Sequence, residues 1–347
     1  MRDFTNSNNE VQPQTTLPDR EIQTLSVVLD PIRLRKNLRF LSLSPWQWGK
    51  LGDIRIQVLR CHKGRCTFEV ALCTATGMHT LIGKVYAEDA SDIFQAMERI
   101  RQAGFGPEQE YSIPEPVAYL AELRLLMQEK VEGRLAKDVF LEGDEEDRAT
   151  AADQCARWLA RFHAAAPKAG PVLDLNDYMA FLEQCSRNVA SSDPLSGKVA
   201  QLFQCLKRAA SALNHVESRA CHGDYGPIQV ILADGRTVTC DWDRYGVADP
   251  HRDLARFLVQ LERFGLKRFG SIRALDRSAQ VFLKTYAGLG EPANELHLRF
   301  FKGANHLKWT TEKIAKPHWR EKIEATLDAS LRLLATVVLC LLPCFCE

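Results

Sequence analysis

Hydrophobic and polar residues alternate along the chain between residues 54 and 130. The segments IRIQVLRC, CTFEVALCTA and HTLIGKVYA are rich in Val, Ile, Leu and Thr, and glycine-containing turns separate them. This composition is typical of short antiparallel strands. The following segment, residues 91–100, places Ile93, Met97 and Ile100 at helical spacing. We therefore expect a small, mostly antiparallel sheet with one helix in this region.

Helical periodicity replaces strand alternation in the second half of the chain. Four bulky residues recur at spacings of three and four, namely Cys155, Trp158, Leu159 and Phe162. Such spacing places them on one helix face. The acidic run LEGDEEDR just before them is expected to be a solvated loop. Further helices are predicted at about 175–187, 195–214, 250–265, 271–288, 291–314 and 318–342.

A strand-rich first half and a helical second half predict an α+β protein with two lobes. We place the N-terminal lobe at 29–130 and a larger C-terminal lobe at 131–347, a division that the length of 347 residues permits. The first residues are polar and rich in Asn, Gln and Thr. A disordered tail is therefore expected over 1–28.

The overall charge excludes one broad class of function. The chain has 45 Lys and Arg residues against 44 Asp and Glu residues, so its net charge is +1. A general nucleic-acid binder normally carries a basic excess, and we expect no nucleic acid as partner.

The cysteines and the two ends of the chain indicate the cellular compartment in which the protein is expected. The eleven cysteines are scattered, and the N-terminus has no apolar signal core. Free thiols in a reducing cytoplasm are the expectation. The apolar tail at 333–342 falls far short of the roughly 20 residues that span a bilayer. We expect it to be the buried end of a helix, with a homodimer or membrane-surface contact as the alternative.

A predicted hairpin in the C-terminal half gathers polar side chains at one end. Asp234 and the glycine after it lie between the apolar runs QVIL and TVTC, which is a strong signal for a two-residue turn. With that turn, Gln229 lies opposite Cys240, and Asp241 follows directly. The loop that carries Asp224 leads into the same end. The register thus predicts that Asp224, Gln229 and Asp241 share one mouth of the hairpin.

Two carboxylates and an amide oxygen at one mouth suit a hard cation such as Mg²⁺. Magnesium with few protein ligands usually binds together with phosphate groups. A further carboxylate has another expected role, because Asp249 followed by proline is a good N-cap and first-turn pair for a helix. Asp253 would then lie inside that helix, where its carboxylate can fold back and brace the loop.

These segments resemble a known family. HGDYGPIQ resembles the H-x-D-x-x-x-x-N catalytic loop of the aminoglycoside phosphotransferase and choline kinase superfamily, and CDWDRYGVADPHRDLARF resembles its metal-binding segment. In the expected order, LIGKVYA resembles the strand with the nucleotide lysine, LRLLMQEKVEG the hinge strand, and WLARFHAAAP the helix after the hinge. The resemblance spans roughly residues 50–335. It implies a protein-kinase-like fold with a β-rich nucleotide-binding N-lobe and a helical C-lobe for catalysis and substrate binding.

The resemblance implies roles in the C-terminal lobe. Asp224 matches the catalytic aspartate, which orients and deprotonates the attacking hydroxyl, and Asp241 matches the aspartate that binds magnesium. Gln229 stands where the family has asparagine, the second metal ligand. His222 is expected to orient the loop. Asp243 can assist the metal or the substrate, or be a surface carboxylate.

The resemblance also implies a nucleotide site in the N-terminal lobe. Lys84 matches the lysine that binds the α- and β-phosphates of ATP. Glu98 is its expected helix partner, with Glu88 as a competitor. Backbone groups of the hinge are implied to hold the adenine, at Gln128, Glu129, Lys130 and Val131.

Two departures from the family pattern stand out. The amide at Gln229 keeps the ligand oxygen of asparagine but adds a methylene group. The phosphate-covering loop is reduced to CHKGRCT, with Gly64 as its one glycine. Lys63 and Arg65 could meet phosphate there, or Gly64 could simply be a turn residue.

The sequence therefore predicts a small-molecule kinase, an ATP- and Mg²⁺-dependent phosphotransferase in the cytoplasm. Its acceptor would be a hydroxyl of a small polar molecule, such as an aminoglycoside, an amino sugar or a sugar. The alternative is a pseudokinase-like nucleotide-binding or scaffold protein with little turnover. A protein side chain as acceptor is a third possibility, for which the sequence shows no docking motif.

Overall fold

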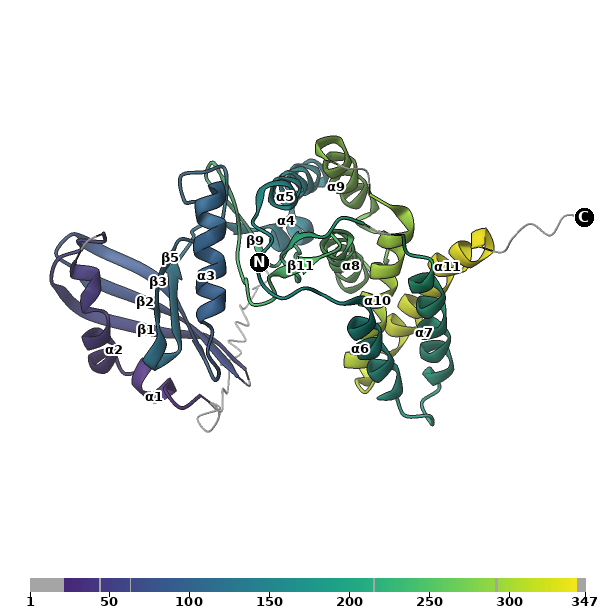
Figure 1. The fold of residues 1–347 in the computed structure, drawn as a ribbon, viewed down its shortest axis with the longest axis horizontal. Coiled ribbons are helices and arrows are strands. Elements are labelled where there is room, and N and C mark those ends of the chain that lie inside the picture. Colours follow the sequence, from purple (N-terminus) through teal and green to yellow (C-terminus); the bar gives the residue numbers. More distant parts are fainter. Residues whose placement is uncertain (1–21, 44, 63, 215, 291–292, 342–347) are drawn as a thin grey trace, which may run out of the picture. The chain divides into compact units, whose positions relative to one another are not determined.

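The computed structural model describes residues 22–43, 45–62, 64–214, 216–290 and 293–341, and the side chains up to residue 335. Its chain divides into two compact units (Figure 1). The first comprises the chain up to Phe94 together with Pro116–Lys130. The second comprises Gln95–Glu115 together with the chain from Val131 onward.

The first unit is built on a five-stranded antiparallel sheet in the order β1-β2-β3-β6-β5. Apolar side chains such as Phe68, Val70 and Leu125 are fully buried and form its core. The expected antiparallel sheet is thus confirmed. The strands are β1 (Leu51–His62), β2 (Arg65–Thr74), β3 (Gly77–Tyr86), β5 (Pro116–Leu120) and β6 (Leu125–Glu129).

Short helices precede the sheet and were not predicted. They are α1 (Leu25–Val28), α2 (Pro31–Asn37) and the 3₁₀ turn η1 (Arg39–Ser42), and α2 packs beside β1 (Figure 1). The Asp30 carboxylate accepts hydrogen bonds from the first backbone N–H groups of α2, which caps the helix. Ile22, Leu25 and Val28 are buried. The prediction of a disordered tail is therefore wrong for residues 22–28, and residues 1–21 lie outside the described part.

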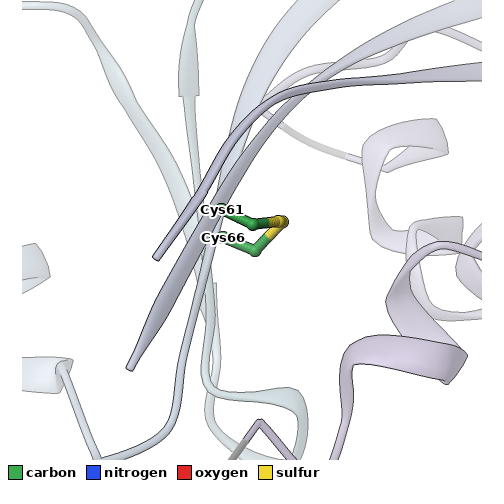
Figure 2. The surroundings of a disulfide bond; sticks show 2 residues. All are labelled: Cys61 and Cys66. Atoms are coloured by element: carbon green, nitrogen blue, oxygen red, sulfur yellow. A yellow bond between two sulfur atoms is a disulfide. The ribbon is translucent and has the colours of Figure 1, made fainter. Parts of the chain in front are cut away.

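A disulfide joins β1 and β2 at the end of their hairpin. Cys61 and Cys66 are directly opposite each other in the register of the two strands, and their sulfur atoms are bonded (Figure 2). The expectation of free thiols is wrong for this pair. Gly64 in the turn has φ +86° with open space around it, as a turn glycine requires. Of the two residues considered for phosphate contact, Arg65 begins β2 opposite His62, and Lys63 lies outside the described residues.

The second unit is mostly helical, and its helices follow the sequence-based prediction closely. The four residues expected on one face of a helix, Cys155, Trp158, Leu159 and Phe162, are all fully buried. The helix α3 (Ser91–Ile100) leads into this unit and continues as a π turn, η2 (Arg101–Phe105). The remaining helices are α4 (Ala136–Glu142), α5 (Glu145–Ala165), α6 (Leu175–Arg187), α7 (Ser196–Ser211), α8 (His251–Arg268), α9 (Asp276–Leu289), α10 (Glu295–Lys313) and α11 (Arg320–Leu341), with 3₁₀ turns η3 (Ala121–Leu123) in the first unit and η4 (Pro317–Trp319) in the second.

The acidic run before α5 is not a loop, so that prediction is wrong. Glu145, Glu146 and Asp147 form the first turn of α5, and Asp144 caps it in a reciprocal capping box with Asp147. Negative charge at a helix N-terminus is favoured by the helix dipole. The same charges that suggested a solvated loop therefore stabilise the start of a helix.

The second unit also contains small β-sheets, which lie between its helices along the sequence. One has the order β4-β10-β9-β7, with β4 parallel to β10 and the other pairs antiparallel, and another joins β8 to β11. Sequence analysis found only the central hairpin, β9 and β10. The strands are β4 (Tyr111–Ser112), β7 (Arg134–Leu135), β8 (Arg219–Cys221), β9 (Val230–Ala233), β10 (Arg236–Thr239) and β11 (Gly246–Ala248).

The C-terminal helix α11 buries Ile323, Leu327 and Leu334. Most side chains of the apolar tail at 333–342 lie outside the described part of the structure. The expected partner or membrane-surface contact would involve those side chains and stays a prediction. None of the helices within the described residues has the length and apolar character needed to cross a membrane.

Candidate active site

The hairpin that was expected to gather the polar residues has the predicted register. Arg236 pairs with Ala233, and Thr239 with Val230, around the turn at Asp234 and Gly235. One step further, the backbone N–H of Cys240 donates to the carbonyl of Gln229 at 2.9 Å. Gln229 therefore lies beside the residue that precedes Asp241, and the predicted register is confirmed.

The loop before this hairpin is held by a buried carboxylate. Asp253, on α8, is fully buried and accepts the backbone N–H groups of His222 at 2.7 Å and Gly223 at 2.9 Å. Burial by itself would raise the pKa of Asp253, but its hydrogen bond to His163 and the positive charge nearby outweigh burial and lower it. Asp253 thus braces the loop as an anion, as expected from its place in the helix.

His222 spans the same loop. Its Nδ1 accepts the backbone N–H of Asp224 at 3.3 Å, so the other ring nitrogen carries the proton and donates to the carbonyl of Cys240 at 3.1 Å. The ring is fully buried and lies 4.7 Å from the ring of Trp242. These contacts join the loop to the hairpin and agree with an orienting role for His222.

Glycine is required at position 223. Gly223 has φ +79°, and a Cβ atom there would lie 2.2 Å from the carbonyl oxygen of Arg244. Both the backbone conformation and the space exclude a side chain. The tight turn delivers the next residue, Asp224, to the mouth of the hairpin.

Asp224 forms an ion pair that sequence analysis did not find. The Nε of Arg256, one turn after Asp253 on α8, donates to Asp224 Oδ1 at 2.7 Å. The pair is partly buried on both sides. A charge-assisted contact of this kind fixes the orientation of a carboxylate. The second oxygen, Oδ2, points toward Gln229.

The amide of Gln229 presents its oxygen to Asp224. Hydrogen bonding orients the amide with its nitrogen donating to the carbonyls of Gly226 and Asp224, each at 3.2 Å. With the amide in this orientation its oxygen faces Asp224, and the amide atom on that side lies 3.5 Å from Asp224 Oδ2. Gln229 and Asp224 are therefore direct neighbours.

Asp241 has an uncommon backbone conformation. Its φ is +75°, in the left-handed region that most residues with a side chain avoid. Aspartate is one of the residues that tolerate this region. Strained backbone of this kind persists where the surrounding structure imposes it, and it often occurs at functional sites.

Changing the length of the Gln229 side chain is expected to change the response to magnesium. Gln229→Asn shortens the side chain and should raise the Mg²⁺ concentration for half-maximal activity by roughly tenfold, the effect of about 1.4 kcal/mol. Gln229→Leu should be worse, because it removes the oxygen and leaves two backbone carbonyls without their donor. We would measure turnover against Mg²⁺ concentration, with thermal melts to separate loss of folding from loss of binding. Equal activity in wild type and the leucine variant would show that Gln229 is not a metal ligand.

Asp249 differs slightly from its expected role. The formal N-cap of α8 is Pro250, one residue later than predicted. The Asp249 carboxylate nevertheless accepts the N–H of His251 at 2.9 Å, and its two oxygens bind the rings of His251 and His297 at 2.6 and 2.5 Å. The pKa of Asp249 is lowered because these hydrogen bonds outweigh burial. Asp249 therefore ties the start of α8 to α10.

The predicted nucleotide residues are divided between the two units, because Glu98 and Val131 belong to the second. Lys84 is buried near the end of β3, paired across the sheet with Thr67 and Leu126. Gln128 and Glu129 end β6, and the chain passes into the second unit between Lys130 and Val131.

The structure gives side-chain contacts for some of the predicted nucleotide residues. The amide oxygen of Gln128 is buried and has no hydrogen-bond partner within the described residues. Lys130 forms an ion pair with Glu69 at 3.1 Å. Glu98, the expected partner of Lys84, forms an ion pair with Arg101 at 3.1 Å, and the competitor Glu88 is exposed.

A small pocket of about 170 Å³ opens beside Asp224, entirely within the second unit. Its positively charged residues were missed by sequence analysis. Arg252 and Arg256 are four residues apart in the segment HRDLARF and so share one helix face, which is the signal that could have found them. The lining residues are Tyr178, Phe181, Gly223, Asp224, Arg244, Arg252, Arg256, Asn305 and Lys308.

The loop braced by Asp253, the β9–β10 hairpin that follows it and the buried lysine of β3 fit the class of two-part, kinase-like phosphotransferases. Comparison with known families agrees, because the phosphotransferase enzyme family matches residues 80–296. That match covers more than half of the chain, and the chain therefore belongs to this family. The expectation of an enzyme of the small-molecule kinase type is confirmed. No curated protein sequence matches the chain.

Solved structures show the same fold at low sequence identity. An aminoglycoside phosphotransferase, APH(4)-Ia, is 15% identical with a TM-score of 0.59, covering 86% of this chain and 98% of that one. A choline/ethanolamine kinase family protein from Mesorhizobium loti is 14% identical with a TM-score of 0.55, covering 88% and 94%. The choline kinase LicA from Streptococcus pneumoniae is 14% identical with a TM-score of 0.56, covering 88% and 99%. The predicted fold class, α+β with a β-rich N-terminal and a helical C-terminal part, is confirmed.

Proposed function

We propose that the protein transfers the γ-phosphoryl group of ATP to a hydroxyl group of a small polar molecule, with Mg²⁺ as cofactor. The observation that carries this proposal is the mouth of the β9–β10 hairpin. There the side-chain amide of Gln229 lies 3.5 Å from the Asp224 carboxylate, and the register places Asp241 at the same end.

The oxygen atoms at this mouth fit the cation that the proposal requires. Carboxylates and an amide oxygen are hard ligands, and Mg²⁺ binds through one or two carboxylates together with phosphate and water. We assign Asp241 and Gln229 to the metal. These residues would hold Mg²⁺ where it could neutralise the negative charge that develops on the transferred phosphoryl group.

The remaining roles are assigned to residues of this chain. Asp224 would accept a hydrogen bond from the acceptor hydroxyl, align it and take its proton. Arg256 would hold the Asp224 carboxylate in place through the ion pair at 2.7 Å. Lys84 is assigned to the nucleotide phosphates, with Glu98 as the residue that would orient Lys84. The backbone of Gln128, Glu129, Lys130 and Val131 is assigned to the adenine.

ATP as phosphate donor has two supports. The family is one of phosphotransferases, and the similar fold of APH(4)-Ia was solved in a ternary complex with ADP and hygromycin B. ATP is abundant in the cytoplasm, and we propose that compartment for the enzyme.

Nucleotide-dependent stability tests this proposal. A ligand that binds only the native state raises the unfolding free energy, by about 2.7 kcal/mol at a concentration 100 times its Kd. We expect ATP with Mg²⁺ to raise the melting temperature clearly, and ATP with EDTA to raise it much less. ADP formation that depends on an added alcohol completes the test. Absence of any nucleotide effect on the melt would refute the proposal.

A further inference from the structure

The pocket beside Asp224 is strongly cationic. Arg244, Arg252, Arg256 and Lys308 line it, and Asp224 is the one carboxylate among the lining residues described. The charges come from different parts of the unit: Arg252 and Arg256 from α8, Lys308 from α10, and Arg244 from the turn before β11. Their convergence beside the proposed base is therefore a property of the fold and not of one charged segment.

Most of these positive charges are not neutralised by the protein. Arg256 is paired with Asp224. Arg244, Arg252 and Lys308, by contrast, form no ion pair within the part of the chain that the structure describes. Lys308 contacts the ring of Phe181 at 5.9 Å. Exposed Glu312, one turn further along α10, offsets part of the charge on Lys308.

Burial and neighbouring like charges both disfavour the charged forms of two basic groups in this region. Burial and, after it, the charge of Arg244 lower the pKa of Lys308. Burial and, after it, the charge of Arg256 lower the pKa of Arg263, which is also on α8, to about 10. A group whose charged form is disfavoured in this way is stabilised by an incoming anion.

We propose that the acceptor of this enzyme is an anion, a small alcohol that carries a phosphate or carboxylate group, which Arg244, Arg252 and Lys308 bind while Asp224 engages its hydroxyl. The inference rests on the function proposed above and names its substrate class. The charge of this proposed acceptor is opposite in sign to that of a cationic amino sugar or a choline-like amine.

Shape and chemistry agree with this substrate class. Guanidinium groups bind carboxylates and phosphates through paired hydrogen bonds. The volume of about 170 Å³ is below the range of pockets that enclose drug-sized ligands, so a small acceptor or the end of a larger one fits. The rings of Tyr178 and Phe181, stacked at 6.3 Å, form one wall. Aromatic rings also attract cations, but here Lys308 already occupies the neighbourhood of Phe181 and would repel a second one.

Matched sets of acceptors test the charge preference directly. Glycerol, glycerate and glycerol 3-phosphate share a hydroxyl-bearing skeleton but differ in charge, as do inositol and inositol monophosphate, and choline and an aminoglycoside supply cationic members. We would measure product formation with ATP and Mg²⁺ by mass spectrometry. Thermal melts with each compound in the absence of nucleotide would report binding alone. We expect turnover and stabilisation with the anionic members.

Two variants connect the preference to the pocket. Arg252→Gln and Lys308→Gln should each raise the KM for the anionic acceptor by roughly tenfold, as expected when a charge-assisted contact is lost. The KM for ATP should change less than twofold. Lys207→Gln, on the exposed side of α7, is the matched control and should change neither value. Melting temperatures would verify that all three proteins fold.

The outcomes separate this inference from the proposed function. Turnover of neutral or cationic acceptors without turnover of anionic ones would overturn the inference and leave the kinase. Anion binding that Arg252→Gln abolishes, without turnover of any acceptor, would support the anionic pocket and count against the kinase. A rise in the KM for ATP alone would show that these cations serve the nucleotide. No binding and no turnover of any anion would overturn the inference.

Discussion

Asp224→Asn is expected to reduce phosphoryl transfer by roughly 10²–10⁴-fold, the usual contribution of a positioned general base. The asparagine keeps the size of the side chain and an oxygen that can accept from Arg256. It has no carboxylate to take the proton of the acceptor hydroxyl. Nucleotide affinity should stay within about twofold (about 0.4 kcal/mol), because the assigned role of Asp224 concerns the acceptor. Single-turnover transfer measured beside a nucleotide titration gives both quantities.

The chain offers a matched control for this substitution. Asp234 is an exposed aspartate at the turn of the same hairpin, and Asp234→Asn makes the same chemical change at the opposite end. It should leave transfer and melting temperature unchanged, since Asn-Gly also favours this turn. A near-normal transfer rate in Asp224→Asn would rule out Asp224 as the base. Equal losses in both variants would indicate damage to the hairpin.

Local sequence signals were sufficient to predict how much of the candidate site is arranged. A two-residue turn leaves no freedom in the pairing of the strands that it joins. The register of β9 and β10, and with it the proximity of Gln229 to Cys240, therefore followed from Asp234 and Gly235 alone. Asp253 was also found, because a carboxylate in the first turn of a helix can reach the loop before it.

Contacts between distant parts of the chain were not available from the sequence. The pairing of Asp224 with Arg256 depends on how α8 packs against the loop, and Lys308 approaches the same pocket from α10. From the sequence alone, charged residues on these helices are expected to face solvent. Only the packed structure shows that Arg244, Arg252 and Lys308 form no ion pair among the residues that it describes.

Two helix starts were readable but were misjudged. Asp30 followed by proline precedes α2, and Asp144 precedes the acidic first turn of α5. Both are N-cap signals. No helix was predicted after Asp30, although it lay at the start of the expected N-terminal lobe. Around Asp144, polar composition was given more weight than position, and the segment was assigned to a solvated loop. The capping residue was more informative than the charge of the segment.

The backbone of Asp241 makes its substitutions unusually informative. Both Asp241→Ala and Asp241→Gly remove the carboxylate assigned to Mg²⁺, and both should lower transfer by roughly 10²–10³-fold, since a metal contact is worth several kcal/mol and each 1.36 kcal/mol is a factor of ten. The effect of ATP with Mg²⁺ on the melting temperature should fall to that of ATP with EDTA in both variants. The two variants should differ only in stability.

The stability difference follows from the φ of +75° at Asp241. Alanine pays about 1–2 kcal/mol in the left-handed region, whereas glycine does not, although glycine loses about 0.4–1 kcal/mol through the greater freedom of the unfolded chain. The glycine variant should therefore be more stable than the alanine variant by about 0.5–1 kcal/mol, measured by denaturant unfolding without ligands. Asp241→Asn, which tolerates this backbone and keeps one oxygen, should fold well and bind Mg²⁺ weakly. An undiminished Mg²⁺-dependent shift in the glycine variant would place the metal elsewhere, and equal stability of the glycine and alanine variants would show that the backbone at this position relaxes when the carboxylate is removed.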